Sequence, residues 1–187
     1  EAGAAVNQAD AEGFTPLYVA CQEGHLECAR LLLEVGAAVD RAMSDGTTPL
    51  SAASFNGEIE CARLLLEAGA AVNQADAEGF TPLYVACQEG HPEVAQLLLE
   101  ASASVGQADK DGVTPLFMAC QNGHLECVRL LLEAGAAVSQ ARNDGATPLF
   151  AACHNGHLEV AKLLSSYGTS RAATPFGTPE EAANSRG

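Results

Sequence analysis

The sequence predicts an all-α repeat solenoid, a curved stack of helix pairs joined by hairpin-like turns. The first observation is a fixed 33-residue period, because the tripeptide Thr-Pro-Leu begins at Thr15, Thr48, Thr81, Thr114 and Thr147. Self-similarity at a period of this length indicates one supersecondary unit stacked repeatedly. The second observation is that each period holds two short segments with apolar residues at helical spacing. We expect a single domain over 1–187, with complete units at about 10–42, 43–75, 76–108, 109–141 and 142–174 and partial units at 1–9 and 175–187.

The first helix of each unit is predicted to begin at the Thr-Pro step. Thr15 is a good N-cap, since its hydroxyl can accept a backbone amide hydrogen bond. Pro16 suits the first helical position, where no amide donor is needed. Leu17 and Cys21 follow on one apolar face, and Gly24 is expected to end the helix.

The second helix is predicted from about residue 26 to residue 34, and Gly36 is expected to stop it. A leucine triplet at 31–33 supplies its apolar stripe, while charged residues occupy the opposite face. Residues 37–39 then lead out as a short extended arm into an acid-glycine turn, in which Gly13 and its equivalents supply a positive φ. Neither helix can bury its apolar stripe alone, so each unit needs its neighbours.

The segment TPLYVACQEGHLECARLLLEVGAAV resembles the ankyrin repeat. The family's pattern is an acid-glycine turn, TPLH, a Gly-His step, a leucine triplet and a Gly-Ala arm, and five periods of this chain match it. One departure is that Gly-His becomes Gly57-Glu58 in the second unit. Another is that the histidine after Thr-Pro-Leu is replaced by Tyr18, Ser51, Tyr84, Phe117 and Phe150.

Composition excludes some partners and favours a compartment. The chain has 24 acidic and 9 basic residues, giving a net charge of −15, which argues against nucleic acid or an anionic membrane as partner. No apolar run is long enough to insert into a membrane. Seven cysteines, an odd number, favour reduced thiols, so we expect an intracellular protein of the cytoplasm or nucleus.

Two features concern the history and the ends of the chain. Residues 1–25 and 67–91 are identical, which indicates duplication of a two-unit block. The identity breaks at Leu26 against Pro92. Because both ends cut through units, we interpret the chain as a fragment of a longer array, monomeric or weakly associated end to end.

The cysteines and histidines that could bind a metal ion are interpreted as structural residues. Cys21, His25 and Cys28 lie at i, i+4 and i+7, which raises the alternative of a zinc site, but other units replace these cysteines without supplying a new ligand. We therefore predict that the cysteines are core residues and that the chain binds no metal or cofactor. The resemblance implies that the Gly-His histidines bridge adjacent loops: His25, His91, His124 and His157. No phosphate-binding glycine motif occurs.

The resemblance further implies that a partner protein or peptide binds the inner face, made of turn tips and exposed first-helix positions. We refer to these residues as the inner-face set. Carried onto this chain, the set is Asp10, Glu12, Phe14, Gln22, Glu23, Met43, Asp45, Phe55, Asp76, Glu78, Phe80, Gln88, Glu89, Asp109, Lys110, Asp111, Gln121, Arg142, Asp144 and His154. Its excess of carboxylates predicts an acidic concave groove that favours a basic, extended segment. Phe14 and Phe80, two periods apart, are the expected exposed apolar anchors.

The leading functional hypothesis is a non-catalytic protein–protein interaction module. The alternative is an ankyrin segment of a larger enzyme, ion channel or ubiquitin-ligase adaptor whose activity lies outside these residues. A third interpretation, a mechanical spacer, predicts that no partner binds.

Overall fold

The computed structural model describes residues 5–167, and within that range the chain forms α-helices and no strand. The helices are α1 Pro16–Gln22, α2 Leu26–Glu34, α3 Pro49–Asn56, α4 Ile59–Glu67, α5 Pro82–Glu89, α6 Pro92–Glu100, α7 Pro115–Asn122, α8 Leu125–Glu133, α9 Pro148–His154 and α10 Leu158–Ser166. The prediction of an all-α repeat solenoid is confirmed. The expected partial unit at 175–187 lies outside the described residues, as do residues 1–4.

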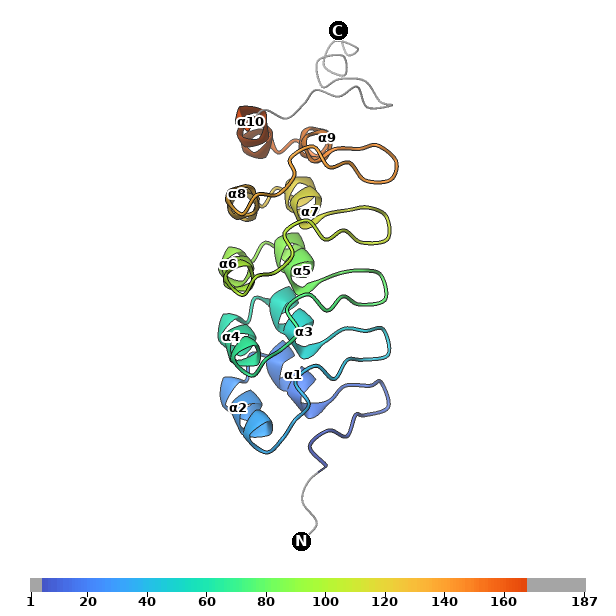
Figure 1. Cartoon of the computed structure of the whole chain (residues 1–187), viewed down its shortest axis with the longest axis vertical. Helices are drawn as coiled ribbons and strands as arrows, with labels where there is room; N and C mark the ends of the chain where they lie inside the picture. Colours follow the sequence, from blue (N-terminus) through green and yellow to red (C-terminus); the bar gives the residue numbers. More distant parts are fainter. Residues whose placement is uncertain (1–4, 168–187) are drawn as a thin grey trace.

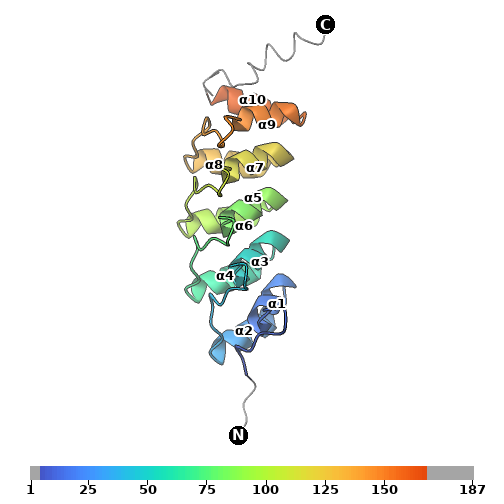
Figure 2. The same cartoon turned by 90° about the vertical axis from the view of Figure 1, so that its right-hand side faces the viewer.

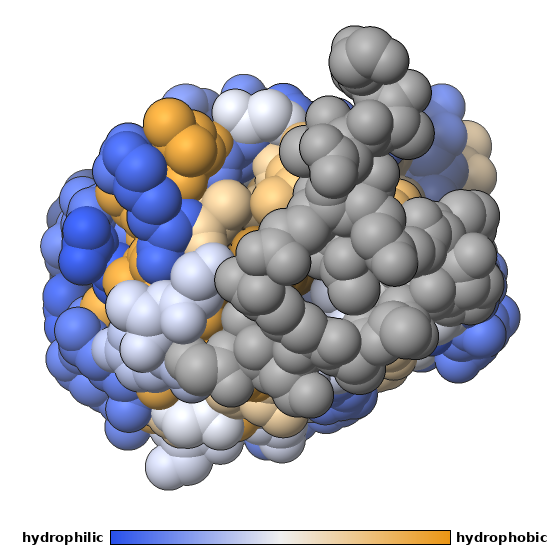
Figure 3. All heavy atoms as spheres, turned by 90° about the horizontal axis from the view of Figure 1, so that it is seen from above, coloured by the Kyte–Doolittle hydropathy of each residue, from blue (hydrophilic) through white to orange (hydrophobic). Residues whose placement is uncertain are grey.

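The helices are stacked in two columns. In Figure 1 the first helix of every pair lies between the projecting turns and the second helix of the pair. Each first helix packs on the first helix of the next pair, and the second helices do the same, so helices contact near neighbours along the stack (Figures 1 and 2). Turns and first helices thus form one side of the molecule, and second helices the other. Figure 3 looks along this stack, with hydrophilic residues over much of the rim.

The Thr-Pro-Leu step builds the same local structure in every pair. In α3, the hydroxyl of Thr48 accepts a hydrogen bond of 3.1 Å from the amide of Ser51, and Pro49 occupies the first turn. The other four threonines cap their helices in the same way. The next residue, Leu50 here, is only 1% exposed. The predicted cap and core residues are therefore confirmed.

Helix ends follow the glycine pattern with two differences. Gly57, Gly90 and Gly123 cap α3, α5 and α7 in the left-handed conformation. Helices α1 and α9 each end one residue earlier than expected, with Glu23 and Asn155 as caps and Gly24 and Gly156 following at φ +69° and +78°. At the end of α6, Ser102 replaces the glycine found after the other second helices and still adopts φ +67°.

The Gly-His step joins neighbouring pairs, as expected for three of its histidines. The ring nitrogen Nε2 of His91 donates to the carbonyl oxygen of Phe55 at 2.9 Å. His124 and His157 bond in the same way to Gln88 and Gln121, at 2.9 and 3.0 Å. Each ring lies against a glycine of the preceding pair, so close that a Cβ there would come within 2.5–2.6 Å of the imidazole. His25, in the first pair, is exposed and makes no ring hydrogen bond within residues 5–167.

The prediction that all the cysteines are core residues is wrong for two of them. Cys28 and Cys153 are exposed, whereas the buried cysteines are Cys21, Cys61, Cys87, Cys120 and Cys127. Cys28 is equivalent to Cys61, which contacts the preceding pair, and Cys153 is equivalent to Cys120 inside the stack. In the first and fifth pairs, those helix faces point away from the rest of the stack. Burial raises the pKa of the Cys21 and Cys120 thiols to about 12.

Candidate functional site

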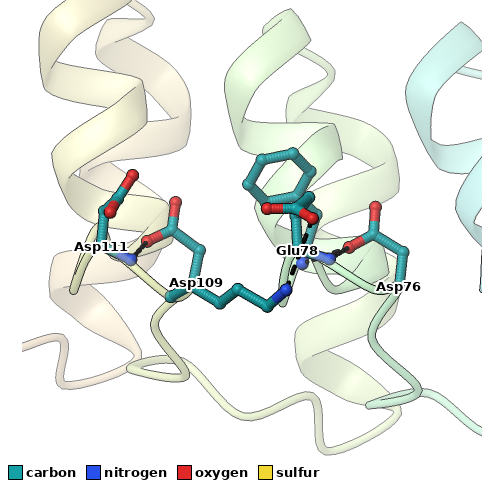
Figure 4. A network of polar contacts seen from close by, with 6 residues as sticks. Asp76, Glu78, Asp109 and Asp111 are labelled. Carbon is teal, nitrogen blue, oxygen red and sulfur yellow. Dashed lines mark hydrogen bonds and ion pairs between the residues drawn. The ribbon is translucent and has the colours of Figure 1, made fainter. Parts of the chain in front are cut away.

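The turn tips are hydrogen-bonded loops that form a continuous row. In each turn one aspartate accepts backbone amides further along: Oδ1 of Asp76 bonds to the amides of Glu78 and Phe80, both at 2.9 Å (Figure 4). Adjacent tips are joined through the backbone, for example by the amide of Lys110 donating to the carbonyl oxygen of Glu78 at 3.1 Å. The row therefore holds its carboxylates at a regular spacing along the inner face.

Some of these carboxylates are already committed to the fold. Oδ1 of Asp109 accepts from the amides of Asp111 and Val113, at 2.9 and 2.8 Å. Its Oδ2 accepts from the hydroxyl of Tyr84 at 3.0 Å. Burial and this hydrogen bond raise the pKa of Tyr84. Asp109 thus acts mainly as a structural residue, while Asp111 beside it is exposed and available.

The two basic residues of the inner-face set are both paired with carboxylates. Nζ of Lys110 lies 3.4 Å from Oε1 of Glu78 (Figure 4). The guanidinium of Arg142 donates to both oxygens of Asp144, and this hydrogen bonding lowers the pKa of Asp144 to about 2. Arg142 also lies over the ring of Phe117, 5.6 Å from its centroid. Among the described residues, the charged members of the inner-face set that form no ion pair are therefore all acidic.

All members of the inner-face set are at least partly accessible. The exposed members are Asp10, Glu12, Glu23, Asp45, Phe55, Glu78, Glu89, Lys110, Asp111, Asp144 and His154. The half-buried members are Phe14, Gln22, Met43, Asp76, Phe80, Gln88, Asp109, Gln121 and Arg142.

Two hollows open on the inner face. The α3–α5 hollow, of about 440 Å³, is lined by Gln22, Phe55, Asp76, Phe80 and Gln88 among others. The α7–α9 hollow, of about 590 Å³, is lined by Phe117, Gln121, Arg142, Asp144, Phe150 and His154 among others. Each hollow combines aromatic walls with amide and charged groups, the combination that binding sites for side chains use.

The expectation that Phe14 and Phe80 are exposed anchors is wrong, because both are half-buried. Phe80 stacks on Tyr84 with ring centroids 4.7 Å apart, and Phe14 meets Tyr18 edge-on at 5.3 Å. The tyrosines that replace the family's histidine supply the rings on which the phenylalanines lie. Phe55, with 47% of its surface exposed, is the more accessible aromatic residue.

A comparison with protein families agrees with this architecture. A model described as ankyrin repeats (3 copies) matches residues 2–76, 40–109 and 102–173. The chain belongs to the ankyrin repeat family. Ankyrin repeats are generally protein–protein interaction modules and typically non-catalytic. No curated protein matches the sequence.

Neither a metal-binding cluster nor a membrane-spanning helix occurs in the part of this ankyrin repeat protein that the structure describes. Residues 5–167 contain no group of three or more histidine, cysteine, aspartate or glutamate side chains placed to hold a metal ion. Cys21, His25 and Cys28 are not brought together, since Cys21 is buried and Cys28 lies on the outward face of the first pair. No helix in the described part of the chain is long and apolar enough to cross a membrane.

Two sets of residues in the ankyrin stack have roles that were not predicted from the sequence. One set bonds the arms of adjacent units: Oδ1 of Asn73 accepts the amide of Ser104 at 2.7 Å, and Asn7 and Asp40 act in the same way. Their recurrence at the 33-residue period was the available signal. The other set lines a hollow on the second helices, where the sequence pattern indicates only a face of charged residues.

Proposed function

We propose that the chain binds a partner protein through a basic, extended segment laid along the inner face. The observation that carries the proposal is the combination of the two inner-face hollows with the row of carboxylates beside them. The inner-face set holds ten acidic residues against Lys110 and Arg142, which are themselves paired. Unpaired carboxylates attract basic segments over a distance that salt shortens, so association should be fast and salt-sensitive.

The spacing of the hollows defines the length of the segment. The α3–α5 and α7–α9 hollows are two steps apart along the first helices. At about 8–10 Å per packed helix, two steps are roughly 16–20 Å. An extended chain covers that distance in about five to six residues, at about 3.3 Å each. One apolar side chain would pack on Phe55 in the first hollow, and a second on Phe150 and His154 in the other.

The binding is non-catalytic in this proposal, and the chain acts in the cytoplasm or nucleus, where its thiols stay reduced. Support comes from the ankyrin family itself and from the free state of all seven cysteines. A larger protein that includes this segment could carry an activity elsewhere, and the inner face would then recruit its substrate or regulator.

The test is selection of peptides from a random displayed library on the immobilised chain. We expect the selected peptides to be enriched in arginine and lysine, with two apolar residues five or six positions apart. Replacing Glu12 and Glu78 by lysine and Phe55 by alanine should weaken their binding at least tenfold and flatten its salt dependence. Glu27→Lys with Glu60→Lys is the matched control, because it changes the same charge on the second helices. Selected peptides without basic residues, or insensitive to the inner-face changes, would refute the proposal.

A further inference from the structure

The second helix of the third pair, α6, differs from its counterparts on the side away from the inner face. Residues 67–91 repeat residues 1–25 without change, so the turn and first helix of this unit duplicate those of the first. The differences begin in α6, where Pro92 and Gln96 stand in place of Leu26 and Arg30. The duplicated unit has therefore kept its inner face and changed its outer helix.

Both changes border one hollow, which we call the outer hollow. It has a volume of about 470 Å³ and spans α4, α6 and α8. Its apolar lining comes from Ile59, Pro92, Leu97 and Leu130. The compact ring of Pro92 fills less space than a leucine would, and the amide of Gln96 is turned along its own helix, donating to Glu100 at 2.7 Å. These two residues leave the space open.

The charged groups around the outer hollow are not balanced on α6. On α4 and α8, a glutamate pairs with an arginine three residues later, as in Glu126–Arg129 at 3.4 Å. The segment Pro92–Glu100 has two glutamates and no basic residue. Glu93 is exposed and forms no ion pair within residues 5–167. Glu93, Glu100 and Glu126 line the hollow together with one cation, Arg63, which pairs with Glu60 at 3.9 Å.

We propose that the outer hollow is a second docking site, which accepts an arginine side chain presented by a partner protein. The aliphatic stem of an arginine can pack on Pro92, Leu97 and Leu130, because long cationic side chains bury their methylene groups along apolar surfaces. Its planar guanidinium can then pair with a carboxylate at the rim, with two parallel hydrogen bonds where the geometry allows. The guanidinium takes the place of the arginine that α6 lacks. The site is independent of the inner face, so the two surfaces can hold different parts of one partner, or two partners.

The test uses N-acetyl-arginine amide as a probe, followed by the chemical shifts of the backbone amides of the isotope-labelled chain. We expect saturable shifts at millimolar probe concentration, centred on Glu93, Leu97 and Leu130. Gln96→Arg should weaken this binding at least tenfold, because it restores the glutamate–arginine pair present on α4. That variant has a precedent in the same fold, since α2, α4 and α8 all carry arginine at the equivalent position.

Gln121→Arg is the matched control, because it adds the same charge on the inner face and should leave the outer shifts unchanged. N-acetyl-norleucine amide, which keeps the aliphatic stem and lacks the guanidinium, should bind at least tenfold more weakly. Equal shifts with norleucine amide, or shifts unaffected by Gln96→Arg, would overturn the proposal. So would shifts centred on the inner face, or resonances that broaden with protein concentration alone, since the latter would make a second copy the occupant.

Discussion

Ser102→Gly is predicted to stabilise the chain, although it removes atoms and adds no contact. Ser102 is the one non-glycine residue with positive φ within residues 5–167, at +67°. Gly36, Gly69 and Gly135 occupy the equivalent position in other units, at φ +93°, +87° and +88°. The backbone bonding is the same, since the amides of Ser102 and Gly69 each donate to a leucine carbonyl oxygen three residues earlier at 3.0 Å. The comparison therefore isolates the conformational cost of a side chain at this position.

The size of the effect follows from two opposing terms. An L-residue in the left-handed region costs about 1–2 kcal/mol relative to glycine. Glycine in turn loses more entropy on folding, which returns about 0.4–1 kcal/mol. The net gain for Ser102→Gly is about 0.5–1 kcal/mol in the free energy of unfolding. For a chain of this length that corresponds to a rise in Tm of about 1–4 °C.

The measurement is equilibrium urea unfolding followed by circular dichroism, with the reverse change Gly69→Ser as the matched control. A Cβ at Gly69 would meet no atom within 4 Å, so the control adds no clash and should lose a similar free energy. The two changes should move the unfolding midpoint in opposite directions without altering the slope. If Ser102→Gly were neutral or destabilising, the cost of the positive φ would have been misjudged.

Two further predictions concern the joints between pairs and the thiols. Glu58→His should raise the free energy of unfolding by about 0.5–1.5 kcal/mol, because the new ring can lie on Gly24 and donate to the carbonyl oxygen of Gln22. The control is Glu58→Gln, for which urea unfolding should show no such gain. An equal gain for the control would contradict the role of the ring. Cys28 and Cys153 should react rapidly with a thiol reagent while the five buried cysteines react only on unfolding, so a count of seven fast thiols by absorbance would contradict the burial of the others.

Much of the fold could be predicted because local signals and the period agree. Thr48 and Pro49 fix where a helix begins, and the apolar residues that follow at helical spacing, such as Leu50 and Ala53, are buried. Repetition then makes the stacking partner of each helix the next copy of itself. The exposure of Cys28 and Cys153 was not predicted, because a 33-residue pattern reports what an average unit buries and carries no information on which units lie at an end.

The candidate site was harder to predict because one residue type performs two tasks. Asp76 and Asp109 carry a negative charge on the inner face, and they also close the turns by accepting hydrogen bonds from backbone amides. Composition counts both as binding groups, and only the hydrogen-bond geometry separates them from the neighbouring exposed Asp111. Phe80 was misjudged for a similar reason, since its exposure depends on Tyr84, whose ring covers one of its faces.

The inner and outer surfaces can change separately because both are made of exposed side chains, and the buried core between the two columns of helices lies between them. The turn and first helix form one side of a pair and the second helix the other. Gln96, for example, is exposed on the second helix and its side chain bonds to Glu100 of the same helix. The chain itself shows such a separate change, because α6 differs in sequence from α2 while the 25 residues before α6 are identical to residues 1–25. If the two docking proposals are both correct and one partner occupies both surfaces, Gln96→Arg and Glu78→Lys must weaken the binding of that partner independently. The double variant then loses the sum of the two changes in binding free energy. A non-additive result would mean that one partner segment wraps from one side to the other, and the two hollows would then belong to a single interface.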